Sequence, residues 1–313
     1  MNFQASQESG RHSGGSALVA VLWLIAILAL TALATVQVVS LDVDVVAAQV
    51  TGFRARQLAE AGIAVGANPA VERDDPVLIQ DFGDDEGFDV RLASEAGRFN
   101  INALVMRDDQ PLLRSMFIDW GLDLDQAQMV VDSLADWIDG DDFISLNGAE
   151  EDWYIEDGRL NQPFNRPFYS LDEMRLVRGM ELIEMMRSDW RDWFTVWSGG
   201  QLDVNEARPE LIAIAAEVSV EDADMIVETV LGPDQIRDTE DDARFENVEE
   251  VLAILGVPEI MRPIVSPRLT VNDTTTRIES IGHSGNARHM TTVIVRNRTG
   301  RPAILQKTEE PIP

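Results

Sequence analysis

A dense group of carboxylates in the middle of the chain is the part of the sequence best suited to chemistry. The stretch also contains glycines and Asn147, which are common in loops. Carboxylates this close repel one another unless a cation lies between them, so the pattern favours a hard ion with oxygen ligands. We therefore predict a calcium site. Its candidate ligands are Asp139, Asp141, Asp142, Glu150, Glu151, Asp152 and Asn165.

The acidic stretch is not an EF-hand. Asp139 to Glu150 has the length of an EF-hand loop, with acidic residues at its first, third and last positions. However, Phe143 and Ile144 occupy the fifth and sixth positions, and the sixth needs glycine for its turn. The alternative to a metal site is a solvated acidic loop. Trp137 and Trp153 count against that alternative, because they would tether the loop to a hydrophobic core.

Composition excludes several other classes of function. The chain has 55 acidic and 25 basic residues and a formal charge of -30, which opposes binding to nucleic acid. It has no cysteine, so it cannot form disulfides, thiolate nucleophiles or Cys-based zinc sites. Its three histidines show no ligand spacing, and no G-x-S-x-G, P-loop or dinucleotide motif occurs. Carboxylates are so numerous that no single pair indicates a glycosidase.

The elements that must position the acidic stretch show an internal repeat. GRFNIN starts at Gly97 and GQLDVN at Gly200, 103 residues apart, and each leads into a helical pattern. FYSLDEMRLVRGM starts at Phe168 and FENVEEVLAILGV at Phe245, 77 residues apart. The first copy is therefore 26 residues longer. We predict that the acidic stretch near 136–165 is the insertion, and that the acidic run Asp238–Asp242 of the second copy is solvated.

The N-terminal region is read as a membrane anchor. Ser16–Leu41 carries no charge and exceeds the roughly 20 residues that a helix needs to cross a bilayer. The alternatives are a buried helix of a soluble protein and a cleaved secretory signal, but this run is longer than a signal core and continues as helix. The junction Gly15-Ser16 resembles a prepilin peptidase site, at which residues 1–15 would be removed and the helix kept.

The remaining segments predict a mixed fold. Val71–Gly87 is expected to be a loop, and Phe88–Asn102 to hold one or two strands. Residues 103–192 and 202–264 have helical patterns. Arg268–Asn297 is expected to form two or three antiparallel strands, and the proline-containing tail after Gly300 to be disordered.

Several motifs together resemble the K-type minor pseudopilins of type II secretion systems (general secretion pathway protein K). Counted from Ser16, the fifth position is Ala20, where most pilin-like proteins have Glu and K-type members do not. One departure from the family is VNEA at Val204–Ala207, where the family usually has Thr before Ala. The other matching stretches are LAEAGI (58–63), GRFNIN (97–102), VVDSLADWIDGDD (130–142), NGAEEDWY (147–154), NRPFYSLDEMRLVRGM (165–180) and SPRLTV (266–271).

The resemblance implies an α+β fold, in which a pilin-like long N-terminal helix and an antiparallel sheet carry a large inserted α-helical domain of two SAM-like units. The implied divisions are a leader (1–15), a transmembrane helix (16–41), a pilin-like domain (42–102 and 265–300), an inserted domain (103–264, with units at about 103–195 and 200–264) and a tail (301–313).

The resemblance also implies a function without catalysis. Such a protein is anchored once in the bacterial inner membrane, with its C-terminal domain in the periplasm. It is processed by prepilin peptidase, is methylated, binds calcium, and initiates and caps the pseudopilus tip with the I-type and J-type minor pseudopilins. Two other hypotheses stay open from the residues alone: a membrane-anchored calcium-dependent binding module and an anchored hydrolase that uses carboxylates.

Overall fold

The computed structural model describes residues 14–107 and 109–312, and the chain divides into two compact units, Met1–Arg54 and Ala55–Pro313. One helix, α1 (Gly14–Gly66), begins in the first unit and ends in the second. Its stretch Ala17–Val38 has a mean hydropathy of 2.7, and its side chains are exposed. Among the described residues it is the one helix that is long and apolar enough to cross a membrane. Residues 1–13 of the predicted leader lie outside the described part of the chain.

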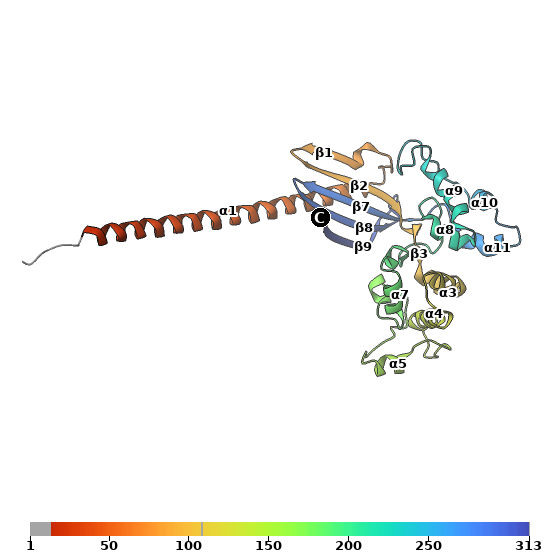
Figure 1. The fold of residues 1–313 in the computed structure, drawn as a ribbon. Helices are drawn as coiled ribbons and strands as arrows, with labels where there is room; N and C mark the ends of the chain where they lie inside the picture. The colour runs from red at the N-terminus through yellow and green to blue at the C-terminus, as the bar shows by residue number, and fades with distance from the viewer. Residues whose placement is uncertain (1–13, 108, 313) are drawn as a thin grey trace, which may run out of the picture. The chain divides into compact units, whose positions relative to one another are not determined.

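The second unit is built on a five-stranded antiparallel sheet of order β1-β2-β7-β8-β9 (Figure 1). β2 and β7 are neighbours in the sheet, although the helical insert separates them in sequence. The strands predicted within Arg268–Asn297 form β7 and β8, which confirms that prediction. The strands are β1 (Ile79–Gly83), β2 (Glu86–Ser94), β7 (Thr275–Ser284), β8 (Ala287–Arg296) and β9 (Ala303–Ile312).

Two segments that were predicted to lack regular structure contain strands. The tail after Gly300 forms β9 and pairs with β8 along almost its whole length, so the predicted disorder is wrong. Its Pro311 is tolerated because β9 is an edge strand, where a missing N–H can face solvent. The predicted loop Val71–Gly87 contains a 3-10 turn, η1 (Pro76–Leu78), and β1.

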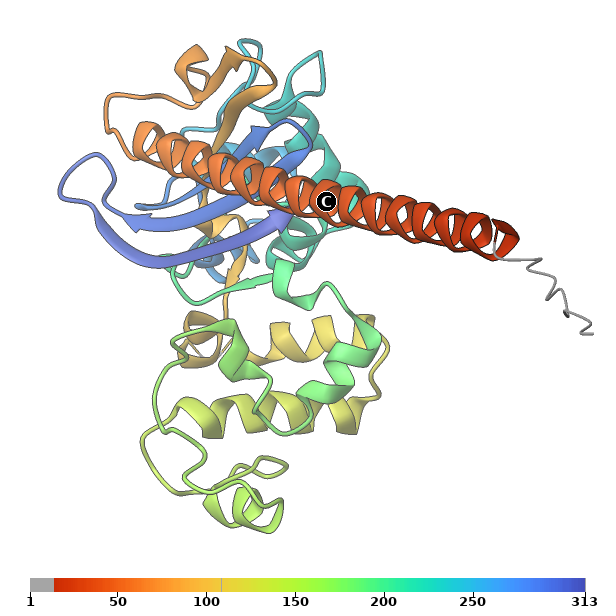
Figure 2. The same cartoon turned by 90° about the vertical axis from the view of Figure 1, so that its left-hand side faces the viewer.

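The end of α1 packs against one face of this sheet (Figure 2). Ala55 and Ala59 are fully buried there. Gly282 of β7 allows the close approach, because a Cβ at this position would lie 2.0 Å from the Ala55 carbonyl oxygen. Apolar side chains of β2, β7 and β8 complete a small core beneath the helix: Phe88, Val90, Leu92, Ile278, Val293 and Val295.

The insert between β2 and β7 consists of two helical halves, each enclosed by a short parallel strand pair. β3 (Phe99–Asn100) pairs with β4 (Phe194–Thr195), and β5 (Leu202–Asp203) pairs with β6 (Leu269–Thr270). The first half contains α2 (Ile101–Met106), α3 (Gln110–Asp119), α4 (Leu124–Ile138), α5 (Glu151–Glu156), α6 (Leu171–Met174) and α7 (Met180–Met186). The second half contains α8 (Pro209–Ala216), α9 (Val220–Leu231), α10 (Val248–Ile254) and α11 (Arg262–Val265).

The repeated sequence motifs meet in space in the same way in both halves. The Asn102 side chain accepts a hydrogen bond from the Phe168 N–H at 2.8 Å and donates one to the Phe168 carbonyl at 3.0 Å. Asn205 makes the same two bonds with Phe245, at 2.9 and 3.0 Å. Each pair satisfies a backbone N–H and C=O far away in sequence. The halves differ in the segment after α4, which contains α5 and the acidic stretch and has no helical counterpart after α9.

Candidate metal centre

The acidic stretch follows α4, whose position is fixed at both ends. Asp123 and Gln126 form a reciprocal capping box at its start. At its end Trp137 is fully buried and stacks on Phe168, with ring centroids 6.2 Å apart. The tether expected from Trp137 is therefore present. Trp153 is half-buried and packs against the same core, and its neighbour Tyr154 makes an edge contact with Trp137 at 5.5 Å, which holds α5 there.

Two carboxylates of α4 that the sequence reasoning missed organise the loop. Asp136 is fully buried and accepts hydrogen bonds from the Ser145 N–H at 3.2 Å. Asp132 is also buried and accepts one from the Asn147 N–H at 3.1 Å. Burial raises the pKa of Asp136, and the nearby Asp132 charge raises it further. The loop therefore folds back over the end of α4 through backbone N–H groups.

Glu150 is the most perturbed of the predicted ligands. Glu150 is buried and lies directly before α5. Burial, followed by the charges of Asp136 and Asp139, raises the pKa of Glu150 to about 7. The charges of Asp142 and Asp141 act in the same direction. A bound cation would stabilise the ionised form of this carboxyl group. Its positive charge would offset both the lost hydration and the repulsion between carboxylates.

Three predicted ligands contribute a buried oxygen atom that has no hydrogen-bond partner in the structure. These atoms are Asp139 Oδ1, Glu150 Oε1 and Asn165 Oδ1. Gln162 Oε1, which the sequence reasoning did not select, is a fourth. Buried polar atoms are normally paired, and oxygens of carboxylates and amides are the atoms that calcium prefers. Burial also raises the pKa of Asp139, with repulsion from Asp141 and Asp136 adding to it.

The other predicted ligands are not drawn together. Asp141 and Asp142 are exposed in the loop, and Glu151 and Asp152 are exposed in the first turn of α5. In that turn their charges favour the helix N-terminus, which is a structural role. Across residues 14–107 and 109–312, no three Asp, Glu or His side chains converge closely enough to hold a metal ion. Asp139, Glu150 and Asn165 thus each have a buried oxygen without a partner, but the described residues show no formed ligand shell.

The second acidic run is stabilised by its own hydrogen bonds. Asp242 accepts from the Asp238 N–H at 2.7 Å, and Asp241 accepts from the Asp234 N–H at 3.1 Å. Asp238 also lies 3.6 Å from Arg91 of β2.

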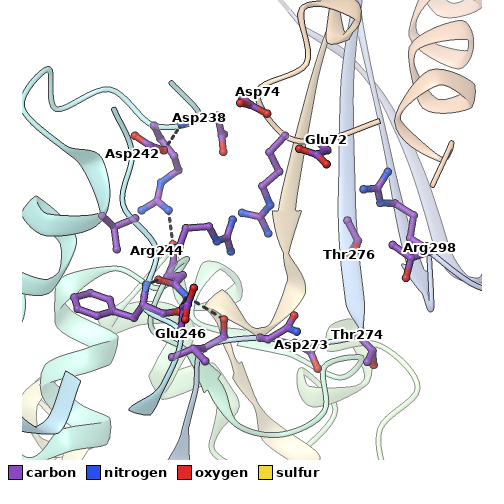
Figure 3. A pocket seen from close by; sticks show the side chains of 18 of the residues that line it. Glu72, Asp74, Asp238, Asp242, Arg244, Glu246, Asp273, Thr274, Thr276 and Arg298 are labelled. Atoms are coloured by element: carbon purple, nitrogen blue, oxygen red, sulfur yellow. Dashed lines mark hydrogen bonds between the residues drawn. The ribbon is translucent and has the colours of Figure 1, made fainter. Parts of the chain in front are cut away.

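The run borders a large cavity of about 900 Å³ between the sheet and the second helical half. Figure 3 shows Asp238, Asp242 and Arg244 on one side of this cavity and Glu72 and Arg298 on the other.

The predicted processing site lies at the start of α1. The backbone of Gly15 and Ser16 is helical and belongs to the first turn of that helix. Ala20 follows within the same helix. Gly15 and Ser16 directly precede the apolar stretch Ala17–Val38, and Ala20 lies within it, so processing at this junction stays a prediction.

Part of the chain is similar to proteins of one known family. The model of the family "type II secretion system (T2SS), protein K" matches residues 97–187, the half of the insert that contains the acidic stretch. The type II secretion system protein K of Pseudomonas aeruginosa is 28% identical over 149 residues, covering 44% of this chain and 43% of that protein. Over these stretches the chain is similar to the type II secretion system protein K family. The protein K of Dickeya chrysanthemi is 36% identical over 70 residues, covering 22% of this chain and 19% of its own length.

The fold of this chain is also found in a solved structure. A chain in the crystal structure of the GspK-GspI-GspJ complex, from the type 2 secretion system of enterotoxigenic Escherichia coli, superposes with a TM-score of 0.57. The superposition covers 82% of this chain and 93% of that chain, at 17% sequence identity. The predicted α+β class, with a long N-terminal helix, an antiparallel sheet and a helical insert, is confirmed. The alignments with the Pseudomonas and Dickeya relatives span less than half of their length.

Proposed function

We propose that the protein is a minor pseudopilin of a type II secretion system, without catalytic activity, that initiates and caps the tip of the periplasmic pseudopilus. The observation that carries this proposal is one continuous helix that is apolar over Ala17–Val38 and packs against a sheet at its other end. A helix of this kind can anchor a subunit in the inner membrane and also join it to a filament. The large insert between β2 and β7 makes the head bulky, which suits an end position.

The absence of Glu at the fifth position supports a position at the tip. In related filaments Glu compensates the N-terminal amine of a neighbouring subunit, and Ala20 cannot do so. The partners that we propose are an I-type and a J-type minor pseudopilin, because the related crystal structure is titled as a GspK-GspI-GspJ complex. Prepilin peptidase would cut between Gly15 and Ser16 and leave the apolar helix in place.

The two halves of the insert are proposed as SAM-like units, at about 103–195 and 200–264. Their support is the matching pair of Asn-to-Phe backbone bonds and the matching parallel strand pairs that enclose them. The pilin-like part would then comprise residues 42–102 and 265–300, extended by β9.

We propose calcium as the ligand of the acidic stretch. The residues that fit a hard cation best are Asp139, Glu150 and Asn165, because each has a buried oxygen without a hydrogen-bond partner. Asp141, Asp142, Glu151 and Asp152 are exposed, so they would have to move inward or act through water. Calcium would supply the positive charge that the buried carboxylates lack, and it would join α4, the loop and α5.

The calcium proposal is tested by melting the full-length protein in non-ionic detergent with calcium or with EGTA. A ligand present at about 100 times its Kd stabilises the folded state by about 2.7 kcal/mol, so the melting temperature should rise by several degrees. The variant Glu150→Gln should lose most of this rise, and the exposed control Glu221→Gln should keep it. An unchanged melting temperature in millimolar calcium would refute the site.

The filament proposal is tested by replacing Gly15 with valine in cells that depend on this protein for secretion. We expect an unprocessed form that stays in the membrane fraction and secretion reduced to background, whereas Gly14→Val serves as the neighbouring control. Normal processing and secretion in Gly15→Val cells would contradict the proposal. Co-purification of the I-type and J-type partners with the wild-type chain tests the tip assembly separately.

A further inference from the structure

A cavity in the second unit is unusual for a chain with a net charge of -30, because arginines line it. It has a volume of about 420 Å³ and lies between the end of β2 and the start of the second helical half. Three acidic side chains, Asp192, Glu206 and Glu279, also reach it. Its five arginines are Arg91, Arg98, Arg208, Arg237 and Arg277, so cations outnumber anions along its wall.

Three of these arginines are neutralised by carboxylates of the chain. Arg277 lies 2.7 Å from the buried Glu95, and Arg91 lies 2.7 Å from the nearly buried Glu206. Arg237 lies 3.9 Å from Glu206 and donates to the Asn205 carbonyl at 2.8 Å. Carboxylates of the chain itself therefore largely neutralise these three arginines.

Arg98 and Arg208 are different. Within the described part of the chain, neither forms an ion pair with a carboxylate. The half-buried Arg98 has no hydrogen bond in the structure, and Arg208 reaches only the Asp192 carbonyl, at 3.4 Å, and the Trp193 ring, at 4.9 Å. Burial lowers the pKa of Arg98 and repulsion from Arg277 lowers it further, whereas the charges of Glu95, Glu279 and Asp192 raise it without reversing the direction. A half-buried guanidinium without a partner carries a cost that an anion would remove.

The backbone around the cavity also favours an anion. Arg208 occupies the N-cap position of α8 and supplies no side-chain cap, so the positive end of that helix lies on this side. Gly97 passes so close to Glu206 that a Cβ would lie 2.8 Å from the Glu206 Cγ. Glycine at position 97 therefore allows the backbone beside Arg98 to pack directly against Glu206 in the cavity wall.

We propose that this cavity is an oxyanion-binding site, in which Arg98 and Arg208 donate to a carboxylate or phosphate-type group. Guanidinium groups recognise such groups by charge-assisted, often bidentate hydrogen bonds. The cavity has the size of an ordinary ligand pocket, so it accepts either free phosphate or an acidic side chain with its neighbouring residues. This site goes beyond the proposed pseudopilin function and does not depend on it.

The larger cavity of Figure 3 does not share this preference. It is lined by Arg73, Arg237, Arg244 and Arg298, but acidic residues outnumber these arginines along its wall. Arg298 already donates to three backbone carbonyls, those of Gly66, Asn68 and Val71. An excess of arginine thus distinguishes the smaller cavity beside Arg98.

The test is a calorimetric titration of the full-length protein in non-ionic detergent, at fixed ionic strength. The two probes are inorganic phosphate and a short peptide rich in glutamate. We expect saturable binding of at least one probe to wild type, and about a tenfold or greater loss of affinity in Arg98→Gln and Arg208→Gln. Arg301→Gln removes the same charge from an exposed position and should bind as wild type does.

The outcomes separate the two sources of the ligand. If phosphate binds and the peptide does not compete with it, the ligand is a free anion. If the peptide binds more tightly and phosphate displaces it, the ligand is an acidic protein segment. No saturable binding of either probe, or equal losses in Arg98→Gln and Arg301→Gln, would overturn the proposal. Far-ultraviolet circular dichroism of each variant verifies that it is folded.

Discussion

The raised pKa of Glu150 makes the stability of the folded protein depend on pH. In the unfolded chain its pKa is 4.5, whereas in the folded protein burial and neighbouring carboxylates raise it to about 7. Below pH 4.5 both states hold the proton. Between these two values the unfolded state releases its proton while the folded state keeps it, so the free energy of unfolding falls as pH rises.

We therefore expect the calcium-free protein to lose stability between about pH 4.5 and 7, and to level off above pH 7. The loss from Glu150 is at most on the order of 3 kcal/mol, because one pKa unit corresponds to about 1.4 kcal/mol and solvent screening reduces the effect. Raised pKa values of Asp136 and Asp139 act in the same direction. Urea unfolding at several pH values measures how the free energy of unfolding changes with pH. Glu150→Gln should flatten the slope, and an identical slope in wild type and Glu150→Gln would contradict the assignment.

The site residues show what sequence could and could not provide. The excess of carboxylates at Asp139–Asp152 is visible in the sequence, as is the preference for an oxygen-ligated cation. Asp132 and Asp136 were missed because in α4 they occupy ordinary helical positions. Only the fold shows that the loop returns over them and that Ser145 and Asn147 donate to them. Which carboxylates become buried depends on this long-range packing.

At the scale of elements, the contact between α1 and the sheet depends on glycine. A Cβ on Gly282 would lie 2.0 Å from the Ala55 carbonyl oxygen and 2.3 Å from the Ala59 nitrogen. These are backbone atoms of a helix, so the helix itself would have to move. We expect Gly282→Ala to cost about 1–3 kcal/mol or more, as overpacking does, and to lower the melting temperature.

Gly52 provides the control for this prediction. It lies in the same helix, with nothing within 4 Å of an added Cβ. Gly52→Ala should leave the melting temperature unchanged or raise it, because alanine is favoured over glycine in a helix by about 1 kcal/mol. Equal melting temperatures for both variants would show that Gly282 does not set the packing distance.

β9 is the element on which sequence and structure differ most. The tail after Gly300, which contains β9, has three prolines, and this predicted disorder. Strand pairing with β8 is a long-range interaction that local propensity does not reveal. Ion pairs from β9 to the end of α1 reinforce it, with Arg56 and Glu309 2.7 Å apart and Lys307 joined to Glu60. By contrast, α1 and the repeated motifs were predictable, because an uncharged run and a spaced Asn–Phe pattern are local signals.

Truncation after Gly300 tests β9 directly. It would remove the ion pairs to α1 and the 2.6 Å hydrogen bond from Trp197 to Gln306, and it would expose the edge of β8. We expect a lower melting temperature and concentration-dependent aggregation, because an uncovered strand edge can pair with another chain. Light scattering and thermal unfolding measure both effects. The exposed control Ile304→Ser should stay within about 0.5 kcal/mol of wild type, whereas a fully stable truncated chain would show that β9 is dispensable.

At the scale of the whole molecule, one group of arginines in this chain of charge -30 lies where parts of the second unit meet. Glu206, whose side chain is 5% exposed, lies at the centre of one such group. Arg73 from the segment after α1 lies 2.6 Å away, Arg91 of β2 lies 2.7 Å away, and Arg237 from the segment after α9 lies 3.9 Å away. One carboxylate thus joins the sheet to the second helical half.

Replacing this carboxylate should weaken the connection between the two parts. In Glu206→Gln the neighbouring guanidinium groups would repel one another without compensation, and breaking a buried ion pair in this way costs about 3–5 kcal/mol. We expect a lower urea midpoint and a broadened or two-step transition, because the sheet and the second helical half would unfold less cooperatively. Added salt should restore part of the loss by screening the arginines. Glu210→Gln, at an exposed position in α8, controls for the loss of one negative charge, and a single unshifted transition in Glu206→Gln would show that apolar packing alone couples the two parts.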